Sequence, residues 1–162
     1  MRLRIRIPSA RFVAATELPG YALCFHKRSN IDGSGKCTLL SSQQQQVYTA
    51  IYEIAPSALS KLDQIEGVGA GYERRVVSVP QIGPCHAYFA TESHLDSSLQ
   101  PFTWYKNLVL AGCRALDFPA MYTESIKKIG SADDPSVARA VRHALLLRKL
   151  RKVAIQVAAA GV

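Results

Sequence analysis

The chain has 162 residues, 48% of them hydrophobic, and a formal net charge of +8 at pH 7. This length fits one domain whose core needs neither disulfides nor a metal to fold. No apolar run approaches the roughly 18 residues of a transmembrane helix. The first eight residues lack the continuous apolar stretch of a secretory signal. We therefore expect a cytoplasmic protein without a membrane span.

The cysteines favour the same compartment. Cys24, Cys37, Cys85 and Cys113 contain no Cys-x-x-Cys pair, and their spacings fit no zinc module. Four buried free thiols in a reducing cytosol are the simpler interpretation. The sequence thus predicts no metal centre.

The positive charge is concentrated at the two ends of the chain. All 12 acidic residues lie between Glu17 and Asp134. The excess basic residues are Arg2, Arg4, Arg6 and Arg11, then Arg139, Arg142, Arg148, Lys149, Arg151 and Lys152. A basic tail can bind nucleic acid or an anionic membrane, but it is more commonly a solvated helix face. Nucleic acid is not indicated, because no aromatic side chains interrupt the run at 148–152.

Alternating apolar residues predict strands in the first part of the chain. Residues 11–16 and 21–26 read as two strands around a turn at Leu18-Pro19-Gly20. A short strand at 37–40 and a longer one at 46–54 follow, separated by a glutamine-rich loop.

The middle of the chain predicts a helix followed by two strands. Pro56 is tolerated in the first turn of a helix, and Gly67 is a common stop after one. Strands at 72–79 and 85–90 are then joined by a turn rich in proline and glycine.

The last part predicts helices. One covers 101–116, a shorter one follows Pro119, and a final one runs from Asp133 through at least Lys152. Strands dominate the first half of the chain and helices the second. The fold class is therefore α+β, with a small mixed sheet or barrel and helices packed around it.

Two glycine-rich segments resemble nucleotide-binding loops only in part. The run from Gly67 to Gly71 follows a helix and precedes a strand, the reverse of a dinucleotide loop. The run from Gly33 to Cys37 lacks the first glycine and the final Ser/Thr of a phosphate loop. Neither segment predicts a nucleotide site.

The most informative segment is Leu62-Asp63-Gln64-Ile65-Glu66-Gly67-Val68, followed by Tyr72. It places Glu66 in the last turn of a helix, beside a glycine stop and the start of a strand. The helix dipole makes a glutamate unfavourable there, and residues that break a local rule are more often functional. The alternative is an ordinary helix-end carboxylate.

This segment resembles the one by which the γ-glutamylcyclotransferase-like (AIG2-like) family is identified. Further similar segments follow the family's order, from Pro8 to about Asp134. They are Pro8–Phe12, Leu18–Phe25, Gly33–Gly35, Ala87-Tyr88 and Pro101–Cys113. The resemblance implies a γ-glutamylcyclotransferase-like domain over 1–134 and a basic C-terminal helical extension over 135–162.

The resemblance also implies a fold and an activity. Family members are small mixed barrels with helices, and they convert γ-glutamyl amino acids or amines to 5-oxoproline and a free amine. By resemblance Glu66 is the catalytic acid/base. Tyr72, Tyr88, Tyr105 and Gly67 bind or support the small γ-glutamyl substrate. The lyase reaction requires no cofactor.

One family feature is missing. Family members begin with a strand ending in Tyr-Gly-Ser-Asn, whose N–H groups hold the glutamyl end of the substrate. Here residues 1–8 match the helix after that loop. Either the true start lies upstream of Met1, or this is a short form that has lost catalysis.

Two other functions stay open. One is a non-catalytic small-molecule-binding or interaction module of the same fold, and the other is binding of an anionic polymer through the basic C-terminal helix. The sequence defines neither the amine that leaves nor the oligomeric state.

Overall fold

The computed structural model describes the backbone of residues 2–159 and the side chains of residues 3–149. Met1, where the true start was questioned, and the basic side chains of Arg151 and Lys152 lie outside those limits. The chain divides into two compact units, Met1–Leu99 and Gln100–Val162. These units are defined by their internal contacts. The domain boundary after residue 134, which the family resemblance implies, stays a prediction.

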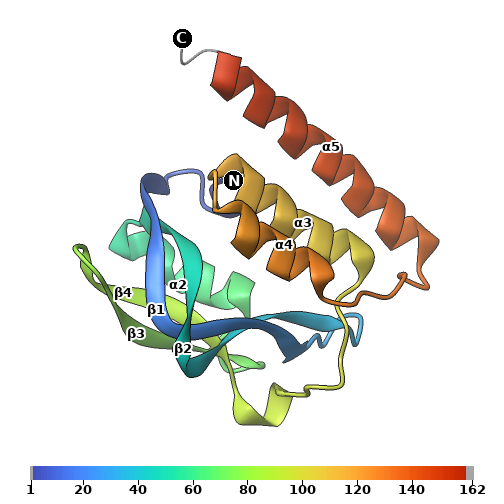
Figure 1. The fold of residues 1–162 in the computed structure, drawn as a ribbon, viewed down its shortest axis with the longest axis horizontal. Helices are drawn as coiled ribbons and strands as arrows, with labels where there is room; N and C mark the ends of the chain where they lie inside the picture. Colours follow the sequence, from blue (N-terminus) through green and yellow to red (C-terminus); the bar gives the residue numbers. More distant parts are fainter. Residues whose placement is uncertain (1, 160–162) are drawn as a thin grey trace. The chain divides into compact units, whose positions relative to one another are not determined.

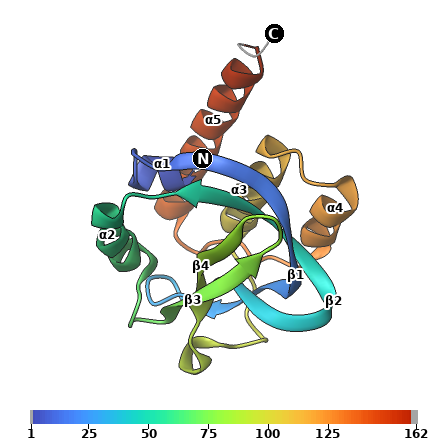
Figure 2. The same cartoon turned by 90° about the vertical axis from the view of Figure 1, so that its left-hand side faces the viewer.

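Two antiparallel hairpins form the sheets of the first unit. β1 (Arg11–Arg28) pairs with β2 (Gly35–Glu53), and β3 (Tyr72–Val79) pairs with β4 (Gly83–Ala90). Figure 2 shows the long β1–β2 ribbon curving around the β3–β4 hairpin. Helices are also present, so the α+β class is confirmed.

The prediction of two strands around a turn at Leu18-Pro19-Gly20 is wrong, because β1 runs through this segment. The pairing register changes there, from Pro19 opposite Gln46 to Tyr21 opposite Ser41. Gly20 has a φ of 84°, which a residue without a Cβ adopts freely. Proline is tolerated in a strand where the ladder is interrupted. These residues thus bend a continuous strand.

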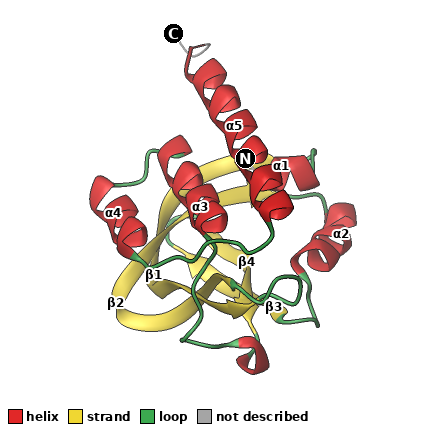
Figure 3. Cartoon of the chain, turned by 90° about the vertical axis from the view of Figure 1, so that its right-hand side faces the viewer, coloured by secondary structure: helices red, strands yellow, loops and turns green. Residues whose placement is uncertain are grey.

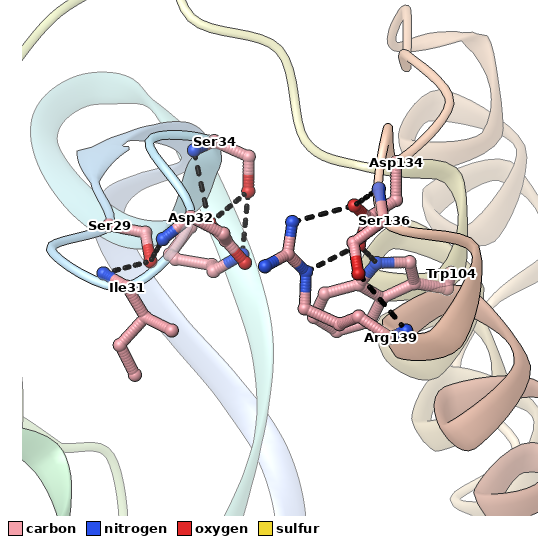
Figure 4. Close-up of polar contacts among 9 residues, drawn as sticks. Ser29, Ile31, Asp32, Ser34, Trp104, Asp134, Ser136 and Arg139 are labelled. Atoms are coloured by element: carbon pink, nitrogen blue, oxygen red, sulfur yellow. Dashed lines mark hydrogen bonds and ion pairs between the residues drawn. The ribbon is translucent and has the colours of Figure 1, made fainter.

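The loop between β1 and β2 is closed by its own side chains (Figure 4). Asp32 accepts hydrogen bonds from the backbone N–H of Ser34 at 3.1 Å and from the Nζ of Lys36 at 3.1 Å. The Oγ of Ser29 accepts from the backbone N–H of Ile31 at 3.3 Å. Lys36, near the start of β2, is therefore ion-paired with Asp32 of the loop.

Two helices of the first unit, α1 (Arg2–Arg6) and α2 (Pro56–Glu66), carry residues of the candidate site. They meet at a buried cluster of Ile7, Ala10 and Leu62. The predicted limits of α2, Pro56 and Gly67, are confirmed. The packing brings the last residues of both helices together. A short 3-10 turn, η1 (Glu92–His94), follows β4.

The second unit is helical. α3 (Thr103–Ala115) lies between α4 (Ala120–Lys128) and α5 (Val137–Ala159), as Figures 1 and 3 show. The indole of Trp104 on α3 stacks on the imidazole of His143 on α5, with ring centroids 3.7 Å apart. No helix within residues 2–159 is both long and apolar enough to cross a membrane.

Asp134 ties the start of α5 to α3 (Figure 4). Its carboxylate accepts hydrogen bonds from Trp104 Nε1 at 2.8 Å, from Ser136 N at 2.8 Å, and from Arg139 Nε and Nη2 at 2.6 Å each. The side chain of Asp134 has 0% of its surface exposed. The hydrogen bonds from Arg139, with those from Ser136 and Trp104, hold the pKa of this carboxyl well below its usual 3.8.

Candidate active site

The end of α2 fixes the position of Glu66. Gly67 takes the left-handed conformation, with φ 79° and ψ 44°. Its N–H donates to the carbonyl of Asp63 at 2.9 Å, and the N–H of Val68 donates to the same carbonyl at 2.9 Å. These bonds satisfy carbonyl groups that the last helical turn would otherwise leave open. Glu66 is thus the last residue of a well-terminated helix.

Asp63 lies one turn before Glu66 on the same face of α2, since residues three apart are neighbours on a helix. The hydroxyl of Tyr88 on β4 donates to Asp63 Oδ1 at 2.8 Å. Arg74 Nη1 on β3 donates to Asp63 Oδ2 at 2.8 Å. Arg74 and Tyr88 are direct partners in the β3–β4 ladder, so the hairpin presents both groups to the helix. Each oxygen of Asp63 therefore accepts a hydrogen bond from the β3–β4 hairpin.

Glu66 differs from Asp63 in having one open oxygen. Arg6 Nη1 on α1 donates to Glu66 Oε1 at 2.6 Å. Within the described part of the chain, Oε2 accepts no hydrogen bond. The Glu66 side chain is 27% exposed and that of Arg6 is 29% exposed. Glu66 is thus a held carboxylate with an accessible oxygen, which suits proton transfer.

Tyr88 is a hydrogen-bond donor at this site. Burial, the hydrogen bond to Asp63 and the negative charges of Asp63 and Glu66 raise the pKa of its hydroxyl far above the usual 10. The hydroxyl therefore keeps its proton throughout the neutral range.

A cavity of about 320 Å³ lies in the first unit, and Tyr88 is one of its lining residues. Its lining also includes Leu62 from α2, His86 from β4, Tyr52 from β2, and Ile54 just after β2. The volume is in the range of small-molecule sites. Tyr88 lines the cavity and also donates a hydrogen bond to Asp63, so it lies between the cavity and the end of α2.

The structure places the other predicted site residues as follows. Tyr72 donates its hydroxyl to the carbonyl of Cys37 at 2.6 Å, and its ring lies 4.9 Å from Lys27 Nζ. Gly67 is the helix stop described above. Tyr105 belongs to the second unit, where its ring packs edge-on against Trp104. The substrate-binding roles of these residues stay predictions.

Three charged residues of the site were not singled out from the sequence. Asp63 stood within the informative segment, three residues before Glu66, and that spacing was a usable signal. Arg74 alternates with Tyr72 along β3, but a single strand does not reveal its partner. Arg6 lies 60 positions from Glu66, and no local pattern connects the two.

The solved structures similar to the chain include one named as a cyclotransferase. A structure named γ-glutamyl cyclotransferase has a TM-score of 0.78 and 26% sequence identity, covering 91% of this chain and 90% of its own. A crystal structure of an uncharacterized protein from Homo sapiens has a TM-score of 0.72 and 29% identity, covering 82% of each chain. The expected fold is therefore confirmed.

Curated sequences and a family profile agree with this likeness. The γ-glutamylcyclotransferase of Homo sapiens is 29% identical over 143 residues, which is 82% of this chain and 73% of the relative. That of Mus musculus is 27% identical over 139 residues, or 79% and 71%. The profile of the AIG2-like family matches residues 46–126, which include Glu66 and Tyr88. The chain belongs to the AIG2-like family.

Proposed function

We propose that this chain is a γ-glutamylcyclotransferase-type lyase. It converts γ-glutamyl amino acids or amines to 5-oxoproline and a free amine. The observation that carries the proposal is the open oxygen of Glu66, on a carboxylate whose other oxygen is held by Arg6. The names of the relatives support the same reaction class. The free cysteines favour a cytoplasmic location.

The reaction is an internal aminolysis. The α-amine of the substrate attacks its own γ-carbonyl carbon, so a ring C–N bond forms and the bond to the leaving nitrogen breaks. Glu66 takes one proton from the amine and gives it to the leaving nitrogen. The substrate ammonium loses a second proton to water, and the released amine regains one from water. One carboxylate can serve as both base and acid.

The cavity and Tyr88 supply the remaining parts of the proposal. A flexible γ-glutamyl chain must fold so that its amine approaches its own carbonyl, and confinement supplies part of the rate enhancement. The Tyr88 hydroxyl stays protonated and is positioned by Asp63. We assign it to orienting the substrate at the cavity.

The test is to measure 5-oxoproline released from a panel of γ-glutamyl amino acids and amines. The purified 162-residue chain is compared with Glu66→Gln and with Glu73→Gln. Glu73 is a glutamate of the same unit that pairs with Arg75 at the surface, so it controls for loss of a carboxylate. We expect Glu66→Gln to lower kcat by roughly 10²- to 10⁴-fold, and Glu73→Gln to leave kcat unchanged.

Two outcomes contradict the proposal. Equal turnover in Glu66→Gln removes Glu66 from the chemistry. No turnover from folded wild-type protein on any substrate contradicts the lyase. If this folded protein still binds γ-glutamyl compounds, the result supports the non-catalytic binding module.

A further inference from the structure

Arg6 and Glu66 form an ion pair in which each side chain keeps hydrogen-bonding groups without a partner among the described residues. Arg6 Nη1 donates to Glu66 Oε1 at 2.6 Å. A guanidinium carries five N–H donors, and within the described residues Arg6 uses only this one. The Arg6 side chain is 29% exposed, so its remaining donors can be reached from solvent. The pair therefore offers an open donor edge beside an open carboxylate oxygen.

The packing around Arg6 holds the pair in place. Ile7, the next residue, is 2% exposed and packs with Leu62 of α2. Leu3, one turn earlier on α1, packs against the same cluster. The guanidinium is thus presented from a short helix anchored on both sides of Arg6. A preorganised cation loses less freedom when it binds a ligand.

The α-carbon of a γ-glutamyl compound bears an ammonium and a carboxylate side by side. An arginine and a glutamate in direct contact present the complementary charges in the same close arrangement. Guanidinium binds carboxylate through two parallel N–H donors, which fixes orientation as well as position. Placing the carboxylate on Arg6 would bring the neighbouring amine to Glu66.

The second ion pair of the site lacks this property. Arg74 pairs with Asp63, but Asp63 accepts from Arg74 through one oxygen and from Tyr88 through the other. Each oxygen of Asp63 is thus already directed at a protein donor, whereas within the described part of the chain Glu66 Oε2 is not. Of the two ion pairs on α2, the Arg6–Glu66 pair is therefore the one whose carboxylate has an oxygen without a donor among the described residues.

We propose that Arg6 binds the α-carboxylate of the γ-glutamyl substrate and so places its α-amine at Glu66. This inference rests on the proposed function and names a specificity determinant for it. It makes the α-carboxylate a requirement for good substrates. A 4-aminobutanoyl amide has the same amine and carbonyl without the carboxylate, and it would be a poor substrate.

The first test crosses the protein variant with the substrate. Release of alanine is measured from γ-glutamyl-alanine and from 4-aminobutanoyl-alanine, with wild type, Arg6→Gln and Arg4→Gln. Arg4 is exposed on the same helix and controls for the loss of charge. We expect removal of the carboxylate to lower the wild-type kcat/KM by about 10- to 100-fold. Arg4→Gln should behave as wild type.

The expected signature is the loss of this discrimination in Arg6→Gln. Its kcat/KM for γ-glutamyl-alanine should fall to the level of 4-aminobutanoyl-alanine, mainly through KM. A structural role for Arg6 would instead slow both substrates by the same factor. Such a parallel loss, or unchanged discrimination, overturns the proposal.

The second test needs no turnover and uses the product as the probe. Calorimetry compares 5-oxoproline, which retains the carboxylate, with pyrrolidin-2-one, which lacks it. Wild type and Glu66→Gln should bind 5-oxoproline at least about tenfold more tightly than Arg6→Gln does. Pyrrolidin-2-one should bind all three equally. No binding of 5-oxoproline to wild type, or equal binding to Arg6→Gln, overturns the proposal.

Folding and function can be separated. If Arg6→Gln does not fold, Arg6→Lys retains the charge but not the planar fork, and it should show an intermediate loss of affinity for 5-oxoproline. Wild-type affinity in Arg6→Lys overturns bidentate binding. If wild type has no turnover but its binding of 5-oxoproline depends on Arg6, the lyase proposal fails and the carboxylate site stands.

Discussion

Two hydrogen-bonded clusters of this protein, each centred on an aspartate, have similar members but differ in whether a neighbouring acceptor is left open. In the first unit, Asp63 accepts from Arg74 and from the hydroxyl of Tyr88. In the second, Asp134 accepts from Arg139 and from the indole N–H of Trp104. Each is an aspartate held between an arginine and the polar edge of an aromatic ring.

The two clusters differ in whether an acceptor without a hydrogen bond lies beside the aspartate. Asp134 has no exposed side-chain surface and is also capped by the N–H of Ser136, so its cluster is closed. Asp63 is followed one turn later by Glu66, which keeps an open oxygen. A fully satisfied polar network makes a structure rigid, whereas an open acceptor on a rigid support is available for chemistry. The comparison separates a closed carboxylate from one with an open oxygen, to which we assign the proposed acid/base role.

Glu66→Asp should have the largest effect. It keeps the charge but withdraws the carboxylate by one methylene, and a displacement of about 1 Å at a reacting group can lower the rate by roughly 100-fold. Steady-state kinetics on a γ-glutamyl amino acid measures kcat. Glu73→Asp on β3 is the control. An undiminished kcat in Glu66→Asp would show that catalysis does not depend on the exact position of this carboxylate oxygen.

Asp134→Asn should lower stability without changing kcat. The amide nitrogen is a donor and cannot accept from Arg139 or Trp104, so hydrogen bonds to a charged group are lost. We expect the midpoint of thermal unfolding to fall by roughly 3 to 8 °C. An unchanged midpoint would mean that the closed cluster contributes nothing to stability.

Acid should narrow the difference in stability between wild type and Asp134→Asn. The pKa of Asp134 in the folded protein is depressed, so its contribution is present above the usual value of 3.8 and is lost as the pH falls through the folded pKa. Urea unfolding between neutral pH and pH 3 should show the two stabilities converging below pH 3.8. A constant gap would contradict this assignment.

Tyr88→Phe should have a smaller effect on stability. It leaves Asp63 Oδ1 without its donor, but Asp63 is partly exposed, so water can replace the hydroxyl. We expect a loss of about 1 kcal/mol in urea unfolding. A loss as large as that of Asp134→Asn would show that the two clusters are equally closed.

Gly67→Ala tests the support under Glu66. An added Cβ would meet only the Ala70 carbonyl oxygen, at 4.0 Å, so the change acts through the backbone. A residue with a Cβ at φ 79° should cost about 1 kcal/mol in the free energy of unfolding. Gly112→Ala, inside α3 with nothing within 4 Å, should instead stabilise by about 0.5–1 kcal/mol. Equal effects would remove the role of the left-handed stop.

The sequence predicted α2 well because local chemistry sets both of its ends. Pro56 suits the first turn, and Gly67 supplies a left-handed stop. These rules need no knowledge of the rest of the chain. The same stop places Glu66 at the helix end, whereas its acid/base role was implied by the family resemblance and stays a prediction.

The sequence did not predict the continuity of β1 or the partners of Glu66. At Pro19 and Gly20 the local turn signal is overridden by pairing with β2, which continues past the bend. The contact between Arg6 and Glu66 joins two helices through a buried cluster, and only tertiary packing determines it. Local propensity carries no information on such a pair.

The residues of the two ion pairs on α2 all lie within Met1–Leu99. Tyr88, which links them to the cavity, lies there as well. Substitutions in the helical unit after Gln100 therefore replace none of the residues that make these charge contacts. Among the predicted site residues, Tyr105 alone belongs to that unit. A substitution at Tyr105 would therefore test its predicted substrate contact while leaving both ion pairs of α2 in place.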